Sequence, residues 1–322
     1  MNALIGVDVG ATAISAGLVT RDGEVSMVVR AASRGNGPTT AVDTVLALVR
    51  GLVAEAGDRG IALEGVGIGL PGLVDADKGM MIDAVNLMPE FAHVPLAQLL
   101  HAATGLPVYV DNDVNVLALG EHFFGLGRGA HSLVVLAVGT GPGGAIVIGD
   151  RLVRGHSGCA GEFGHIPIDL DGPPCVCGGH GCLNLWVGGQ AIAEKARNGR
   201  RAAQSSMLVA LAGGDASRIT AEMVFSAASA GEAVARTIVE EACRALGVGL
   251  ATIVNSLNPE VLVVTGGVAA SLVALEDEVR GHTARYALPR ALAGTRIHIV
   301  PGDKRRTLVG GATLVLYELQ RT

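Results

Sequence analysis

Two segments of this chain, beginning at residues 4 and 132, share one pattern: an apolar run, a glycine-containing turn and a second apolar run. The turns are Gly10-Ala11-Thr12 and Gly139–Gly144. Short apolar runs bounded by glycine are typical of buried strands. The repetition predicts two similar α/β domains with a cleft between them. The flanking apolar runs are Leu4–Val9, Ala13–Val19, Ser132–Val138 and Ala145–Ile148.

Helical and strand patterns alternate along the rest of the 322 residues, which is a comfortable length for two domains. We predict an N-terminal domain of residues 1–112 plus about 303–322, and a C-terminal domain of residues 113–302. The further strands expected are Val25–Ala32, Val66–Leu70, Val108–Val110, Glu260–Val264 and Arg296–Val300, and the main helices are Pro95–Thr104, Val114–Phe124 and Val309–Leu319.

Charge and hydropathy exclude two classes of partner. The net charge is −6, and no run of Lys and Arg is interleaved with aromatic residues, so we expect no nucleic-acid binding. The uncharged stretch 132–149 is interrupted by the glycine-rich turn, so we expect no membrane span. No basic stretch precedes Asp8, and we therefore expect a cytoplasmic protein without a signal peptide.

Both glycine turns have the composition of phosphate-binding loops. Small residues let backbone N–H groups approach phosphate oxygens, and the hydroxyls of Thr12 and Thr140 add donors. Asp8, just before the first turn, can hold a Mg²⁺ ion through water. Each turn alone is also compatible with an ordinary hairpin, but two such turns at equivalent places in a repeat favour nucleotide binding.

A polar cluster, Asp111-Asn112-Asp113-Val114-Asn115, follows one predicted strand and precedes a helix. Side chains at the carboxyl end of a strand are placed to meet a ligand. One aspartate can be the general base for a sugar hydroxyl, and Asn112 can hold neighbouring hydroxyls. The alternative is that this cluster caps the following helix.

The pattern Cys175-x-Cys177-x₄-Cys182 indicates a metal site. Three thiolates and one imidazole satisfy tetrahedral Zn²⁺, and the intervening glycines let the loop fold tightly. Three free thiols without a metal would be an oxidisable cluster with no purpose. The residues leave the fourth ligand open among three histidines: His156, His165 and His180.

Together these segments resemble the ROK family of repressors, open reading frames and sugar kinases. The matching motifs occur in the family's order and span nearly the whole chain. They are Asp8-Val9-Gly10-Ala11-Thr12, Val110-Asp111-Asn112-Asp113, Gly139-Thr140-Gly141-Pro142-Gly143-Gly144, Arg154-Gly155-His156, Gly161-Glu162-Phe163-Gly164-His165, Cys175-Val176-Cys177-Gly178-Gly179-His180-Gly181-Cys182 and Thr265-Gly266-Gly267-Val268.

The resemblance implies an actin/hexokinase-type fold of two RNase H-like domains, with ATP and Mg²⁺ in the cleft and a structural Zn²⁺ near the sugar. It implies a kinase acting on the 6-hydroxyl of a hexose, most simply glucose, with Asp113 as catalytic base. The implied sugar ligands are Gly72, Asn112, Asp113, Glu162, His165 and Asn184. The implied nucleotide ligands are Asp8, Gly10, Thr12, Thr140, Gly141, Gly266 and Gly267, and the implied zinc ligands are His165, Cys175, Cys177 and Cys182.

The chain departs from the family pattern at two places. Ala11 and Ala13 stand where a second glycine and a lysine are usual, which leaves inorganic polyphosphate open as an alternative phosphate donor. Asn184 stands where the family's kinases have glutamate at the anomeric end of the sugar. An N-acyl hexosamine or a sugar-like cyclitol of the valiolone type is therefore an alternative to glucose.

Two other functions compete with kinase activity. The family's repressors carry an added N-terminal helix-turn-helix domain, and here the first strand begins at about residue 3. A catalytically silent sugar sensor would not need Asp113 together with both phosphate turns. We therefore expect an enzyme that, like its relatives, forms a homodimer or homotetramer.

Overall fold

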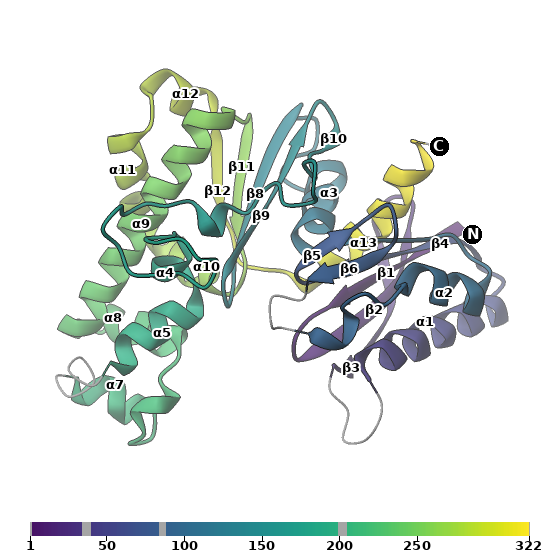
Figure 1. Cartoon of the computed structure of the whole chain (residues 1–322), viewed down its shortest axis with the longest axis horizontal. Helices are drawn as coiled ribbons and strands as arrows, with labels where there is room; N and C mark the ends of the chain where they lie inside the picture. Colours follow the sequence, from purple (N-terminus) through teal and green to yellow (C-terminus); the bar gives the residue numbers. More distant parts are fainter. Residues whose placement is uncertain (1, 34–39, 84–87, 199–204, 322) are drawn as a thin grey trace. The chain divides into compact units, whose positions relative to one another are not determined.

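The computed structural model describes residues 2–33, 40–83, 88–198 and 205–321. The chain divides into two compact units (Figure 1). Unit 1 comprises Met1–Leu133, Ala145–Ala160 and Asp303–Thr322, and unit 2 comprises Val134–Gly144 and Gly161–Gly302.

Unit 1 is built on a five-stranded sheet with the order β3-β2-β1-β4-β7. The first three strands are antiparallel neighbours joined by tight turns, whereas β4 and β7 lie parallel to β1 and are reached through helices. The elements are β1 (Asn2–Val9), β2 (Ala13–Thr20), β3 (Val25–Ala32), α1 (Ala41–Asp58), β4 (Ala62–Leu70), β5 (Leu73–Asp75), β6 (Met80–Asp83), η1 (Pro89–Phe91), α2 (Leu96–Thr104), β7 (Val108–Asn112), α3 (Asp113–Phe124), β10 (Arg151–Leu152) and α13 (Lys304–Leu319).

Helices cover both faces of this sheet. Buried side chains of α1 and α2 form the main core with β1, β2, β4 and β7. On the other face α13 approaches so closely that a Cβ on Gly6 would lie 1.9 Å from the Leu308 carbonyl oxygen, and one on Gly67 would lie 1.8 Å from that of Gly311. Glycine is required at both strand positions because the backbones touch there. Helix α3 packs against α13 on the same face.

The second sheet repeats the order of the first, as β10-β9-β8-β11-β12. Strands β8 (Ser132–Val138) and β9 (Pro142–Ile148) pass from one unit into the other along the chain. In each sheet the two strands that come first in the chain flank a glycine turn: β1 and β2 in the first sheet, β8 and β9 in the second. The two strands that come last in the chain, β4 and β7 or β11 and β12, are parallel to each other. The two-domain α/β fold predicted from the repeated pattern is therefore confirmed.

Unit 2 is mostly helical outside its sheet. The 25-residue helix α9 packs along α11, and α8 and α5 also contact it (Figure 1). The elements of unit 2 are η2 (Phe163–His165), α4 (Asn184–Val187), α5 (Gly189–Arg197), α7 (Ser206–Leu211), η3 (Ala216–Arg218), α8 (Ala221–Ser229), α9 (Ala233–Leu257), β11 (Val261–Thr265), α10 (Gly267–Leu272), η4 (Val273–Leu275), α11 (Glu276–Tyr286), α12 (Pro289–Gly294) and β12 (Arg296–Ile299).

Some boundaries differ from the sequence expectations. Strand β9 begins at Pro142, inside the predicted glycine loop, and α13 begins at Lys304, where Asp303 caps it by accepting from Arg305 N at 2.8 Å. The predicted domain boundary at 112/113 also differs, because α3 clusters with unit 1. The cause is packing: a Cβ on Gly120 of α3 would lie 3.0 Å from Gly310 N of α13.

Candidate functional site

The junction of β7 and α3 carries the predicted catalytic base. Asp113 is the first residue of α3 and is partly buried, and its Oδ1 accepts a hydrogen bond from Val114 N at 3.0 Å. The preceding residue, Asn112, caps the helix by accepting from Val114 N at 2.9 Å and from Asn115 N at 3.2 Å. Asp113 therefore sits at the carboxyl end of a parallel strand, on a fixed helix start.

Asn112 is a helix cap in this structure, which is the alternative interpretation of the Asp111–Asn115 cluster. Its Nδ2 also donates to the carbonyl oxygen of Gly72 at 3.0 Å. Gly72, at φ +96°, follows strand β4, so the fold brings these two predicted sugar ligands together. An amide group has two N–H donors, and one donor of Asn112 is left for a ligand.

The first glycine turn joins β1 to β2 and is closed by backbone hydrogen bonds. Gly10 N donates to Ala13 O at 3.1 Å, and Ser33 N, at the end of β3, donates to Thr12 O at 3.1 Å. The Ser33 hydroxyl also donates to the Gly10 carbonyl. The Thr12 side chain is exposed, as a donor to an incoming phosphate would need to be.

Asp8 lies at the end of β1, and several side chains act on its carboxyl group. Burial raises the pKa of Asp8, while the charge of Lys304, the hydroxyl of Thr307 and the charge of Arg30 act in the opposite direction. The net pKa is raised, so these neighbours do not fully offset the cost of burying the ionised carboxylate. A nearby cation such as hydrated Mg²⁺ would supply the missing positive charge.

The second glycine turn joins β8 to β9 in unit 2 and is tied to the start of α5. Gly189 N donates to Gly139 O at 2.9 Å, and Gln190 N donates to Thr140 O at 3.1 Å. Gly139 N also donates to Gly141 O at 3.2 Å across the turn. The carbonyl groups of this turn are therefore held by the protein itself.

A pocket of about 550 Å³ opens beside this turn in unit 2. Gly139, Thr140 and Gly267 line one part of it, and a Cβ added at Gly267 would meet no atom within 4 Å. The rest of the lining combines apolar and polar side chains from α5, α8 and α10. The apolar ones are Ala193, Ala221, Phe225 and Val268, and the polar ones are Gln190, Arg197, Thr220, Glu222 and Ser271. Such a pocket suits the apolar faces and polar edge of a base attached to phosphates.

The segment that carries two predicted sugar ligands packs beside the same turn. Glu162 is exposed and precedes η2, and its carbonyl oxygen accepts from His165 N at 3.0 Å. Gly164 lies against the start of β9, where a Cβ would be 2.4 Å from the Pro142 carbonyl oxygen. Within unit 2 the fold thus places Glu162 and His165 next to the phosphate-type turn.

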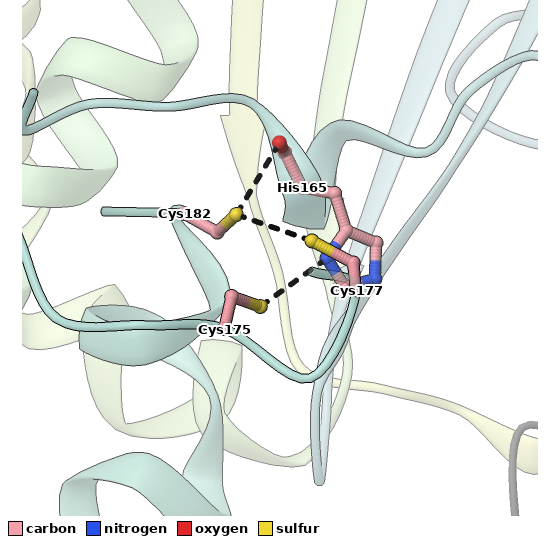
Figure 2. A group of neighbouring side chains, drawn as sticks. All are labelled: His165, Cys175, Cys177 and Cys182. Carbon is pink, nitrogen blue, oxygen red and sulfur yellow. Dashed lines mark hydrogen bonds between the residues drawn. The ribbon is translucent and has the colours of Figure 1, made fainter. Parts of the chain in front are cut away.

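The predicted metal ligands converge in the described part of unit 2 (Figure 2). One ligand atom from each of His165, Cys175, Cys177 and Cys182 lies within 4.8 Å of every other. Cys175 Sγ is 3.6 Å from His165 Nδ1, and Cys177 Sγ is 3.6 Å from Cys182 Sγ. Ligands 2.3 Å from a tetrahedral Zn²⁺ are separated by about 3.8 Å, so this donor set fits Zn²⁺. Of the three candidate histidines, His165 is the one in the cluster.

The thiols of this cluster have opposing tendencies to ionise. Burial raises the pKa of Cys182 to about 12, and the neighbouring thiols of Cys177 and Cys175 add to the rise. The backbone N–H of Gly179 lowers the pKa of Cys177. Thiolates this close repel one another unless a cation holds them, which is the condition that a bound Zn²⁺ satisfies.

Asn184 follows the cluster as the first residue of α4. Its Oδ1 lies against two backbone segments: it would be 3.1 Å from a Cβ on Gly141 and 2.8 Å from one on Gly188. The side chain is partly buried. The residue that replaces the family's glutamate therefore lies directly beside the phosphate-type turn.

Sequence reasoning missed two features of the site. The apolar wall of the unit 2 pocket comes from helices that are distant in sequence, and no local pattern marks it. Arg154 was noted only as part of a motif, yet its guanidinium forms ion pairs with Asp111 and Glu318 in unit 1. Burial tends to lower the pKa of Arg154, but these two carboxylates outweigh it and the pKa is raised.

Among the residues that the structure describes, no helix combines the length and the apolar character needed to cross a membrane.

Known proteins share both the sequence and this fold. The family model described as "ROK family" matches residues 4–317. The glucokinase of Halalkalibacterium halodurans is 36% identical over 320 residues, covering 97% of this chain and 94% of that enzyme. The crystal structure of a ROK family glucokinase from Streptomyces griseus, in complex with glucose and AMPPNP, is 33% identical, with a TM-score of 0.76 and coverage of 97% of this chain and 98% of that one. The xylose repressor of Caldicellulosiruptor bescii is 31% identical, covering 82% of this chain and 65% of the repressor.

The family-model match covers nearly the whole chain, including both sheets and the His-Cys₃ cluster, and therefore defines the class of this protein. The chain is a member of the ROK family.

Proposed function

We propose that this protein is an ATP-dependent carbohydrate kinase that phosphorylates the 6-hydroxyl of a hexose, with glucose as the substrate. The glucokinases to which the chain is similar over 97% of its length support the reaction class. One structural observation carries the proposal: the unit 2 pocket joins a glycine-rich turn to an apolar wall, as a nucleoside triphosphate requires. Inorganic polyphosphate has no base to fill that wall.

Asp113 would accept the proton of the sugar's 6-hydroxyl as its oxygen attacks phosphorus. The helix start holds this carboxylate at the strand end, and the remaining Asn112 N–H would bind a neighbouring hydroxyl. Phosphoryl transfer depends on positioning and charge neutralisation, so the two glycine turns and Thr12 and Thr140 would bind the phosphate oxygens. Bound Mg²⁺, held by Asp8 through water, would neutralise part of the charge on those oxygens.

His165 would link the metal cluster to the sugar. Its Nδ1 faces Cys175, so Nε2 is the ring nitrogen left to donate to a sugar oxygen. Bound Zn²⁺ would fix this tautomer and hold the loop, which is a structural role. Glu162, exposed at the same η2 segment, would accept from another hydroxyl.

The position of Asn184 favours one second candidate, a kinase for an N-acyl hexosamine or a sugar-like cyclitol. An amide beside the phosphate-type turn binds a hydroxyl less strongly than a carboxylate does. A cyclitol, whose ring has no anomeric hydroxyl, would lose little from this exchange. Glucose stays the first proposal because glucokinases are among the relatives at 33–36% identity over nearly the full chain.

A substrate panel tests both candidates. Glucose, mannose, N-acetylmannosamine and a valiolone-type cyclitol are each incubated with ATP–Mg²⁺ or with polyphosphate, and phosphorylated products are identified by mass spectrometry and ³¹P NMR. We expect glucose 6-phosphate from ATP at the highest kcat/KM. Preferential phosphorylation of the cyclitol or the hexosamine would replace glucose by the second candidate, and the absence of any phosphorylated product would refute kinase activity. The expected homo-oligomer and cytoplasmic location stay predictions.

A further inference from the structure

Arg154 joins two distant carboxylates inside unit 1. Its Nε lies 2.7 Å from Asp111 Oδ2, and its Nη2 lies 2.5 Å from Glu318 Oε1. Asp111 is at the end of β7 and its side chain is only 2% exposed, whereas Glu318 is in the last turn of α13. A buried carboxylate needs a charged partner, and Arg154 is the cation that Asp111 contacts.

The other oxygen of Asp111 is bonded to the residues that surround the proposed base. Asp111 Oδ1 accepts from Asn112 N at 2.7 Å and from Asn115 Nδ2 at 2.8 Å. Asp113 lies between those two residues in the chain. The path of the backbone on both sides of Asp113 therefore depends on where the Asp111 carboxylate is held.

The guanidinium group is itself fixed by α13. Arg154 lies over the Tyr317 ring, with Cζ 5.7 Å from the ring centroid, and the Tyr317 hydroxyl accepts from Leu152 N at 3.1 Å. Strand β10, Arg154 and the end of α13 thus form one connected support. An arginine that is bonded at two nitrogens and stacked on a ring has little freedom to move.

We propose that Arg154 is a positioning residue for phosphoryl transfer, holding the Asp111 carboxylate so that the β7–α3 junction directs Asp113 at the sugar hydroxyl. The inference rests on the proposed function and adds to it a residue whose guanidinium is bonded to two carboxylates of unit 1. Its effect is expected on kcat, because a small displacement of a catalytic group slows the chemical step while nucleotide binding in unit 2 is left intact.

A second ion pair on the same helix provides a matched control. Glu121, 1% exposed near the end of α3, pairs with Arg306 of α13, and it also accepts from Leu126 N at 2.9 Å. This pair also anchors α3, but it lies at the end of the helix away from Asp113. Breaking it should loosen unit 1 without redirecting the proposed base.

The test compares Arg154→Met, Arg154→Lys and Arg306→Met with the wild type, using kcat, the KM values for sugar and ATP, and thermal melts. We expect Arg154→Met to lower kcat by about 30-fold with the KM for ATP changed less than about twofold. Arg154→Lys should recover part of kcat, because lysine keeps the charge but makes fewer fixed hydrogen bonds. Arg306→Met should lower the melting temperature while its kcat stays within about twofold of wild type.

A double-mutant cycle covers the case in which Arg154→Met does not fold. Asp111→Asn/Arg154→Met removes the unpaired buried charge, so this double variant should fold. Its loss of kcat should be smaller than the product of the losses in the two single variants. If Arg154→Met alone does not fold, the double variant should still lose at least about fivefold in kcat. An unchanged kcat in the Arg154 variants, or an equal loss of kcat in Arg306→Met, would overturn the positioning role while kinase activity stands. A wild type that phosphorylates no substrate would instead refute the proposed function, and this inference with it.

Discussion

Two adjacent glycines at the start of α10 have different reasons for lacking a side chain. Gly266 has φ +112°, and a Cβ there would lie 2.5 Å from the Val138 carbonyl oxygen. Gly267 has open space around its missing Cβ and lines the unit 2 pocket. The first glycine is therefore needed by the fold and the second by the proposed ligand.

Alanine substitutions separate these two roles. Gly267→Ala should leave the melting temperature nearly unchanged and raise the KM for ATP on the order of tenfold, because the methyl group occupies space next to the phosphates. Gly266→Ala should destabilise the protein by about 1 to 3 kcal/mol, through backbone strain and the contact with Val138. Steady-state kinetics and thermal melts distinguish them, and a Gly267→Ala enzyme with an unchanged KM for ATP would contradict the nucleotide pocket.

Asn184→Glu tests the contact at the anomeric end of the sugar. The change restores a charged acceptor, so the KM for glucose should fall about fivefold, corresponding to about 1 kcal/mol of added hydrogen-bond energy. The KM for 1-deoxyglucose, which lacks the anomeric hydroxyl, should not change. Equal effects on both sugars, or a higher KM for glucose, would show that residue 184 does not bind that hydroxyl.

Asp8 gives a pH-dependent prediction for stability. Burial raises the pKa of Asp8 above its ordinary value of 3.8, so the folded state favours the protonated acid. Folding therefore loses stability from this group as pH rises through the raised pKa. Asp8→Asn should melt at a higher temperature than wild type at pH 7, with the difference shrinking as pH falls through the raised pKa and vanishing below 3.8, and should lose kinase activity. A difference in melting temperature that is independent of pH would contradict this account.

At the scale of elements, the metal loop was the most predictable part of the site. The Cys-x-Cys-x₄-Cys spacing brings three thiols together within one short loop, so the cluster follows from local sequence. The spacing alone left the fourth ligand open, and the choice of His165 came from the family resemblance; the structure places the His165 carbonyl oxygen 3.5 Å from the Cys182 thiol, across the loop. The role of Asn112 could not be chosen from sequence either, since capping and ligand binding use the same residue types.

Removing the metal should affect both stability and sugar binding. Treatment with a chelator should lower the melting temperature by about 5 to 10 °C and raise the KM for glucose about tenfold, because His165 loses its fixed orientation. Cys177→Ser should behave like the chelated enzyme and contain less zinc by elemental analysis. Cys159→Ser, which changes an exposed thiol outside the cluster, is the control and should match wild type. Full zinc content in Cys177→Ser would contradict the assigned ligand set.

At the scale of the whole molecule, the repeated strand–turn–strand pattern predicted two similar α/β domains, and the structure has one five-stranded sheet for each copy of the pattern. The pattern is local, and each copy folds into the first two strands of a sheet with the same strand order. The assignment of α3 to unit 1 could not be predicted from a local pattern, because it depends on the contact of Gly120 with Gly310, 190 residues later. The apolar wall of the unit 2 pocket and the Arg154–Asp111 pair likewise depend on residues that are distant in sequence.

The central claim is that Asp113 is the base of a sugar kinase. The most direct measurement is the rate of glucose 6-phosphate formation by Asp113→Asn, set beside its affinity for glucose measured by calorimetry. The amide keeps the size of the side chain but cannot accept the proton, so kcat should fall by about 10² to 10⁴ while the Kd for glucose stays within about threefold of wild type. Turnover near the wild-type rate would contradict the account.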